Sequence, residues 1–79
     1  MTRAEAYERL NNVFREVLDD DTIELHDETV ADDVDGWDSF EHINLVVAVE
    51  EEFGFKIPMG KTIKMKNVGE MADIIKSQI

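Results

Sequence analysis

The sequence of 79 residues contains no cysteine, which excludes disulfide bonds and metal sites built from thiolates. Its two histidines, His26 and His42, are too few to form a histidine-rich metal site. No apolar run approaches the roughly 20 residues that a membrane-spanning helix needs. The N-terminal segment also lacks the apolar stretch of a secretory signal, so we expect a cytoplasmic location.

Basic residues are scarce as well, since 8 Lys and Arg stand against 19 Asp and Glu, for a net charge of −11. No Lys or Arg occurs between Arg15 and Lys56, whereas carboxylates are concentrated over residues 19–38 and 50–52. This charge repels the phosphates of nucleic acids and of anionic lipids. We therefore expect neither nucleic acid nor a membrane surface as a partner, and a basic protein surface as the natural complement.

A chain of this length forms at most one domain, and we predict a single domain over residues 1–79. Thr2 and Glu5 have the spacing of a capping box, which predicts a first helix over residues 3–18. Apolar residues recur along it at helical spacing, namely Tyr7, Leu10, Phe14 and Val17. The acidic segment 19–37 has no sustained period, so we expect a long first loop that its few apolar residues pin across the helices.

A second helix is predicted over residues 39–53. Asp38 is placed to cap its start, with Glu41 three residues later, and Gly54 suits the left-handed position that ends a helix. The residues at helical spacing include Phe40, Ile43, Val47 and Phe53. The middle of this helix is apolar nearly all round, as expected for a central helix. The pattern does not distinguish a plain core from a pocket for a ligand.

Two further helical segments follow a loop that contains Pro58. A short helical turn is predicted over residues 62–65. A last helix is predicted over residues 68–77, where Asn67 and Glu70 repeat the capping spacing. The predicted fold class is therefore all-α, a bundle of three main helices plus one short helix, with a long first loop.

Ser39 falls on the first turn of the predicted central helix, directly after the long loop. Backbone N–H groups in a first turn lack intrahelical partners, and the helix dipole is positive there. A phosphate esterified to Ser39 would therefore lie in a favourable electrostatic position. A serine at a helix start is commonly structural, so its position alone does not assign a function to Ser39.

The stretch from Asp38 to Pro58, DSFEHINLVVAVEEEFGFKIP, closely resembles the Asp-Ser-Leu segment and following helix of acyl carrier proteins. Residues 68–75 resemble the last helix of that family, and the acidic loop and total length also agree. The resemblance implies that Ser39 accepts 4′-phosphopantetheine from coenzyme A through a separate, magnesium-dependent phosphopantetheinyl transferase. It implies a non-catalytic carrier, because acyl or aminoacyl groups are held as thioesters on the thiol of the added arm.

The resemblance also assigns roles to residues around Ser39. Asp38 matches the family aspartate that helps to present the serine to the transferase. Phe40 stands where leucine is commoner, at a position that contacts partner enzymes. The acidic side of the family's recognition helix, which would attract basic docking patches on acyl-loading, acyl-transfer or synthase enzymes, is matched by Glu41, Glu50 and Glu51. We expect the carrier to be a monomer.

One departure from the family pattern follows Pro58, where fatty-acid-type carriers are usually acidic. The chain has basic residues in this region instead, namely Lys56, Lys61, Lys64 and Lys66. This change alters the partner surface around the predicted short helix. It favours a specialised lipid, polyketide or related biosynthetic pathway over housekeeping fatty acid synthesis.

Two alternatives are close to this interpretation. A peptidyl or aminoacyl carrier would share the arm and much of the fold, and an unmodified helical docking domain would share the fold alone.

A Ser-His-Asp enzyme is a more distant alternative, and it would need Ser39, an acid, and either His42 or His26. No third group is evident to orient His42, which we interpret as an exposed surface residue.

A calcium-binding module is a further alternative, since the first loop is acidic. The EF-hand pattern requires acidic ligands at positions one, three and five and a glutamate at position twelve. Counting from Asp19, the fifth and twelfth positions are Ile23 and Val30, so the pattern fails.

Overall fold

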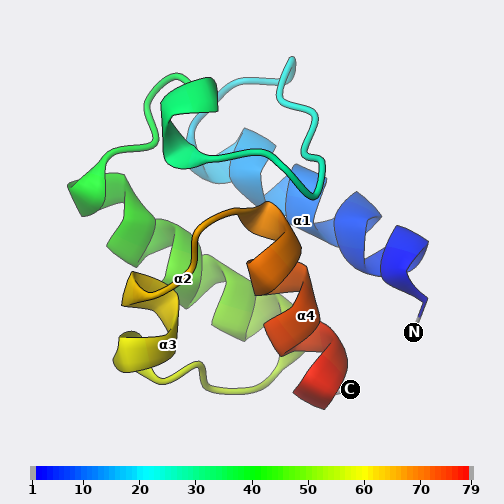
Figure 1. The fold of residues 1–79 in the computed structure, drawn as a ribbon. Coiled ribbons are helices and arrows are strands. Elements are labelled where there is room, and N and C mark those ends of the chain that lie inside the picture. The colour runs from blue at the N-terminus through cyan, green and yellow to red at the C-terminus, as the bar shows by residue number, and fades with distance from the viewer. Residues whose placement is uncertain (1, 79) are drawn as a thin grey trace.

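Residues 2–78 of the chain are described by a computed structural model, apart from the side chains of Met59 and Ile63, and their regular structure is entirely helical (Figure 1). The elements in chain order are α1 (Arg3–Val17), the 3-10 turn η1 (Ala31–Asp33), α2 (Ser39–Phe53), α3 (Met59–Ile63) and α4 (Val68–Gln78). This confirms the all-α prediction of three main helices, one short helix and a long first loop. Figure 1 shows that loop crossing one end of the bundle. No helix in the described part of the chain has the length and apolar character needed to cross a membrane.

The start of α1 is formed by a capping box. Thr2 Oγ1 accepts a hydrogen bond from the N–H of Glu5 at 3.1 Å, and the Glu5 carboxylate accepts one from the N–H of Thr2 at 3.1 Å. The pKa of Glu5 is lowered, mainly by its hydrogen bond with the backbone of Thr2 and next by that with the Thr2 side chain. The helix ends at Val17, one residue before the predicted end, and Asp19 follows in a left-handed conformation with φ of 52°.

The apolar faces of α1, α2 and α4 meet in one core, in which α1 packs against both other helices. The largest completely buried side chains are Leu10, Phe14, Leu45, Val49, Val68, Met71 and Ile75. Burying an aliphatic or aromatic side chain of this size stabilises a fold by about 1.5–3 kcal/mol. The inner face of α2 is therefore packed core, and this packing holds the start of α2 in a defined position.

The first part of the long loop is anchored to α1. Ile23 and Leu25 are buried, and Asn11 Oδ1 accepts the N–H of Leu25 at 2.8 Å. Arg15 Nε donates to the carbonyl of Ile23 at 2.8 Å. Apolar side chains thus pin the loop, and side chains of α1 satisfy its backbone groups.

The second part of the loop is anchored to α4. The carbonyls of Asp27 and Thr29 accept the N–H groups of Gly69 at 3.0 Å and Val68 at 2.8 Å, which belong to the first turn of that helix. A Cβ atom on Gly69 would lie only 2.9 Å from the carbonyl oxygen of Asp27, so this close approach requires glycine. The loop and the start of α4 therefore depend on each other.

Charged groups also tie the loop to α1 and α4. The Asp27 carboxylate accepts hydrogen bonds from the Tyr7 hydroxyl and, at 2.8 Å, from Arg3, whose second Nη atom binds Asp73 at 2.9 Å. The bond from Tyr7, followed by the bond from Arg3, lowers the pKa of Asp27. Burial, followed by the bond to Asp27, raises the pKa of Tyr7. Because exposed ion pairs contribute little free energy, the main effect of this network is to position the loop.

The predicted bounds of the short helix are wrong, because α3 spans Met59–Ile63 and not residues 62–65. Pro58 has a φ of −58°, and its carbonyl accepts the N–H of Lys61 at 2.9 Å. The helix therefore starts directly after the proline. Pro58 itself lies outside the helix, as predicted, but the loop ends at Pro58 and does not continue to residue 61.

Candidate functional site

Ser39 is the first residue of α2, and its side chain is exposed. A tight turn before the helix sets its position. The N–H of Trp37 donates to the carbonyl of Val34 at 3.2 Å, and Gly36 has a φ of 86°, which glycine adopts readily. Asp38 follows in an extended conformation as the N-cap of α2. The hydroxyl of Ser39 therefore stands at the surface where the long loop meets the central helix.

The first turn of α2 is suited to an anion. Asp38 Oδ1 accepts the N–H of Glu41 at 2.8 Å, and the Asp38 carbonyl accepts the N–H of His42 at 2.9 Å. Within the described residues, the backbone N–H groups of Ser39 and Phe40 have no hydrogen-bond acceptor. These two donors and the positive end of the helix dipole favour a phosphate esterified to the serine.

An open groove of about 830 Å³ lies beside Ser39, between the start of α2 and the segment that joins α3 to α4. It is lined by Ala31, Asp32, Trp37, Asp38, Ser39, His42, Ile43, Thr62, Met65, Lys66 and Asn67. An exposed hydroxyl on the wall of such a groove leaves room for a long, flexible substituent. The residues present therefore fit a prosthetic arm attached to Ser39.

Trp37 and His42 form a side-chain pair beside Ser39 that the sequence analysis missed. The indole N–H of Trp37 donates to His42 Nδ1 at 3.2 Å, and the two rings are 12° from parallel with centroids 6.0 Å apart. The Trp37 ring packs edge-on against Phe14, with 4.9 Å between centroids. His42 is half-buried, so its interpretation as an exposed surface residue was wrong. Nδ1 accepts the indole N–H, and within the described residues no carboxylate is bonded to this imidazole, so the oriented base that a Ser-His-Asp site requires is not formed there.

Three apolar side chains of α2 point outward from the bundle. The exposed fraction is 73% for Phe40, 51% for Ile43 and 48% for Val47. Their spacing places them on one side of the helix, in a stripe that begins next to Ser39. The inner face of α2 is formed by Leu45, Val46, Val49 and Phe53. Exposed apolar patches of this kind mark interaction sites, so the apolar stripe (Phe40, Ile43 and Val47) is a candidate partner surface.

The three carboxylates predicted to bind partners have different surroundings. Glu41 Oε1 accepts a hydrogen bond from Asn44 Nδ2 at 2.9 Å. Glu50 is half-buried, and its Oε2 accepts the N–H of Ile57 at 2.6 Å, which ties the end of α2 to the following loop. Glu51 is exposed. Glu41 lies at the start of α2 and the other two near its end, so the structure spreads the three along the helix.

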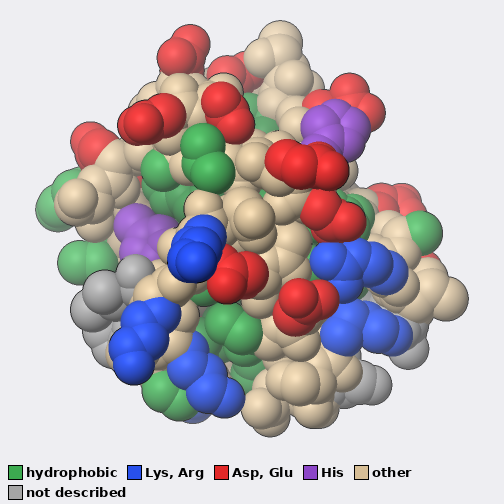
Figure 2. Space-filling model, in the orientation of Figure 1, with side chains coloured by type: hydrophobic (Ala, Val, Ile, Leu, Met, Phe, Trp, Pro, Cys, Tyr) green, Lys and Arg blue, Asp and Glu red, His purple; other side chains and the backbone are tan. Residues whose placement is uncertain are grey.

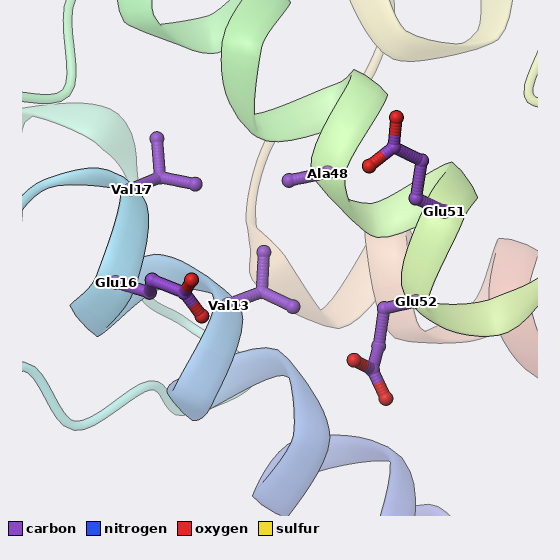
Figure 3. A pocket seen from close by; sticks show the side chains of 6 residues that line it. All are labelled: Val13, Glu16, Val17, Ala48, Glu51 and Glu52. Atoms are coloured by element: carbon purple, nitrogen blue, oxygen red, sulfur yellow. The ribbon is translucent and has the colours of Figure 1, made fainter.

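A second groove, of about 470 Å³, lies between α1 and α2, toward the end of α2 that is remote from Ser39 (Figure 3). Its apolar lining residues are Val13, Val17 and Ala48. Its carboxylates are those of Glu16, Glu51 and Glu52. Glu52 forms an ion pair with Arg9 at 2.7 Å. Among the described residues, no group of three or more possible ligands is arranged to hold a metal ion.

Carboxylates and basic side chains are unevenly distributed over the surface, although ion pairs such as that of Arg3 with Asp27 bring some of them together. Figure 2 shows carboxylates gathered at the top, where Figure 1 places the long loop, and several Lys and Arg side chains lower down, toward α3 and α4. The exposed lysines in and around α3 are Lys56, Lys61, Lys64 and Lys66. Lys66 also lines the groove beside Ser39.

The fold and the site together define a class of protein. A small helical bundle presents an exposed serine hydroxyl at the start of its central helix, beside an open groove and an outward apolar stripe. This is the architecture of a carrier domain that bears a prosthetic arm and offers it to other proteins.

Comparison with known proteins identifies the family. A family model described as the phosphopantetheine attachment site matches residues 8–75. The chain is 30% identical over 80 residues to an acyl carrier protein of Thermosynechococcus vestitus, covering 100% of this chain and 98% of that protein. It is 30% identical over 71 residues to an acyl carrier protein of Clostridium acetobutylicum, covering 90% and 92%. The solution structure of a holo acyl carrier protein from Geobacter metallireducens matches with a TM-score of 0.84 and 43% identity, covering 91% of this chain and 83% of that chain.

The chain therefore belongs to the acyl carrier protein family, which confirms the resemblance seen in its sequence. It is a non-catalytic carrier whose cofactor is a covalently attached phosphopantetheine.

Proposed function

We propose that Ser39 is the residue to which the 4′-phosphopantetheine arm is attached. The observation that carries this proposal is the exposed position of Ser39 on the first turn of α2. There, two N–H groups without an acceptor among the described residues and the helix dipole favour a phosphodiester. Ser39 also lines the open groove and lies within the matched span of residues 8–75. When attached, the arm supplies the terminal thiol that holds acyl groups as thioesters, a group that this cysteine-free chain does not contain.

Few residues could be the attachment site, because the sequence contains two serines, Ser39 and Ser77. Ser77 lies near the end of α4, and its hydroxyl donates to the carbonyl of Ile74 at 2.7 Å. The end of a helix carries the negative pole of its dipole, which disfavours a phosphodiester. Ser39 is therefore the better placed of the two hydroxyls.

Asp38 acts in two ways in this proposal. Its Oδ1 caps α2 by accepting the N–H of Glu41, which fixes the backbone on which Ser39 is presented. The Asp38 side chain is exposed, so a phosphopantetheinyl transferase can contact it while the serine enters the transferase site. Asp38 therefore orients Ser39 and helps the transferase to recognise it.

The partner surface runs along α2 from Ser39. Phe40 begins the apolar stripe, and its ring packs against an apolar surface of the partner enzyme. Basic docking patches on acyl-loading, acyl-transfer or synthase enzymes are attracted by Glu41, Glu50 and Glu51, mainly raising the encounter rate and specificity. The bond between Glu50 and Ile57 leaves the charge of Glu50 in place, so this residue serves both the fold and the electrostatic field.

The lysines in and around α3 favour a particular kind of pathway. They give the partner surface next to the groove a positive side, in a chain whose net charge is −11. A partner matched to this surface carries both basic and acidic contact residues. We assign the carrier to a specialised lipid, polyketide or related biosynthetic pathway, acting as a cytoplasmic monomer.

Intact mass spectrometry tests the attachment site. Apo protein is incubated with coenzyme A, magnesium and a broad-specificity phosphopantetheinyl transferase. We expect one phosphopantetheine on the wild-type protein. We expect none on Ser39→Ala, because the acceptor hydroxyl is gone. The matched control Ser77→Ala, which changes the other serine, loads like the wild type. Loading of a folded Ser39→Ala protein, or failure of the wild type to load, contradicts the proposal.

A further inference from the structure

The imidazole of His42 lies back over the first turn of α2, beside Ser39. Side chains on a helix lean toward its N-terminus, and residues three apart share a face. The 3.2 Å hydrogen bond from Trp37 Nε1 agrees with this direction, because Trp37 precedes the helix and draws the ring toward its start. Ser39 and His42 both line the open groove. Ser39 and His42 therefore share the groove, and their spacing of three residues places them on the same face of α2.

The contact with Trp37 also determines which ring nitrogen of His42 carries the proton. An indole N–H can only donate, so Nδ1 of His42 must accept and is unprotonated. In a neutral imidazole the proton is then on Nε2, which becomes a donor. Within the described residues, Nε2 of His42 has no hydrogen-bond acceptor. This donor is available to a ligand in the groove.

Packing holds the imidazole in place before any ligand arrives. Trp37 packs edge-on against Phe14 at an interplanar angle of 84°, and Phe14 is completely buried in the core. The imidazole in turn lies within 12° of parallel to the indole ring. A side chain fixed in this way loses little conformational freedom when it binds, so its hydrogen bond is more favourable than that of a mobile surface residue.

We propose that His42 is a binding residue for the prosthetic arm, whose Nε2–H donates to a non-bridging oxygen of the phosphodiester on Ser39. This inference rests on Ser39 being the attachment residue. The phosphodiester would then be held on two sides, by the N–H groups of Ser39 and Phe40 at the helix end and by the imidazole at its flank. Trp37 is a positioning residue, since its indole N–H sets the tautomer and direction of the imidazole ring.

The other charged side chains that line the groove explain the need for such a donor. Asp32 and Asp38 are exposed carboxylates, and both repel a phosphodiester. Lys66, on the opposite wall, attracts one but is itself exposed and long, so its position is poorly defined. His42 supplies a donor of defined direction in a groove with both signs of charge. It therefore decides on which side of the helix start the arm leaves Ser39.

Nitrogen-15 and proton NMR of the His42 imidazole tests the contact in the wild-type protein. Apo and holo forms are compared at mildly alkaline pH. We expect Nε2 to be the protonated nitrogen in both forms, and its proton to shift downfield in the holo form as it bonds to the phosphodiester. A proton on Nδ1, or an Nε2–H resonance that is the same in both forms, overturns the proposal. Intact mass of the same sample reports loading, so a failure of attachment at Ser39 is told apart from a failure of this contact.

Phosphorus-31 NMR of holo-protein variants tests the same contact by observing the phosphodiester. We expect His42→Ala to move the phosphorus-31 resonance toward its position in urea-unfolded holo protein. His42→Gln, whose amide nitrogen reaches the place of Nε2, restores most of the wild-type position. Trp37→Phe keeps the aromatic packing but leaves Nδ1 without its donor, so it produces a partial shift.

The matched control is His26→Ala, which removes the exposed histidine of the long loop and leaves the phosphorus resonance unchanged. An unchanged resonance in folded, loaded His42→Ala protein overturns the proposal. If His42→Ala does not fold, the apo and holo comparison of the wild type decides the matter alone.

Discussion

Asp38 accepts the N–H of Glu41 at 2.8 Å and so ends the long loop at the residue before Ser39. Gly36, with its φ of 86°, makes the turn that brings Asp38 to this position. Asp38 therefore meets the structural requirement of capping α2, and the adjacent Ser39 meets the chemical requirement of an exposed hydroxyl. The cap could be predicted from sequence because its signal, an aspartate three residues before a helical N–H, is local.

Substitutions at Asp38 separate these two requirements. We expect Asp38→Ala to lower the free energy of unfolding by about 1 kcal/mol, since the cap is lost, and to slow loading by the transferase. Asp38→Asn retains an acceptor for the N–H of Glu41, so most of the stability returns while loading stays slow. Urea denaturation and initial loading rates measure the two effects. Equal destabilisation by Ala and Asn would contradict the capping role.

The Trp37 and His42 pair could not be predicted from sequence, for a physical reason. Trp37 precedes the first residue of α2, whereas His42 lies within the helix. Their contact depends on the turn at Gly36 and on packing against Phe14. Helical periodicity describes only residues on the same helix, so it places His42 near Ser39 but is silent on Trp37. The burial of His42 follows from this contact and was missed with it.

At the scale of the element, α2 has two apolar faces with different tasks. The inner face includes Leu45, which is completely buried, whereas Phe40 on the outer face is 73% exposed. Sequence periodicity could not tell these faces apart, because the helix is apolar nearly all round. The packing of α1 decides which face is inside.

The two faces respond differently to substitution. We expect Leu45→Ala to lower the free energy of unfolding by about 2–5 kcal/mol, because it opens a cavity in the core. Phe40→Ala changes stability by less than about 0.5 kcal/mol. It lowers kcat/KM of the transferase about tenfold, as expected for an aromatic contact in an interface. Denaturation and steady-state kinetics of both variants check this, and a stability loss in Phe40→Ala equal to that in Leu45→Ala would refute the assignment of the faces.

Helix boundaries followed the sequence where a capping side chain or a left-handed glycine marks them, and failed at α3, whose N-cap makes no side-chain hydrogen bond. The capping box at Thr2 and Glu5 and the left-handed Gly54 mark the start of α1 and the end of α2. The short helix α3 was misplaced because the loop that contains Pro58 was expected to continue to residue 61, whereas Pro58 is the N-cap and the helix begins at Met59. The anchoring of the long loop on α4 was also beyond prediction, since it joins carbonyls and N–H groups some 40 residues apart in the chain.

At the scale of the whole molecule, the long loop is held against α1 and α4 by the network around Asp27. The pKa of Asp27 is lowered in the folded protein, by the bond from Tyr7 first and then by the bond from Arg3. A carboxyl with a lowered folded pKa stabilises the fold above its ordinary pKa in the unfolded chain. This contribution disappears as the pH falls through the lowered, folded value.

The pH dependence of Asp27→Asn tests the network. We expect this variant to be less stable than the wild type at neutral pH, and the difference to shrink as the pH falls through the acidic range and Asp27 becomes protonated. The matched control Asp21→Asn removes another exposed carboxylate of the same loop, one without a hydrogen bond in the described structure, and we expect it to change the stability at neutral pH much less than Asp27→Asn does. Urea denaturation at a series of pH values supplies the data. A gap between Asp27→Asn and wild type that does not change with pH would count against the network.

Tandem mass spectrometry of the loaded wild-type protein after proteolysis tests directly whether Ser39 carries the arm. Fragmentation of the peptides that contain Ser39 and Ser77 locates the phosphopantetheine on one hydroxyl. We expect the whole of the added mass on Ser39. Added mass on Ser77, or on any other residue, would show that Ser39 is not the attachment site.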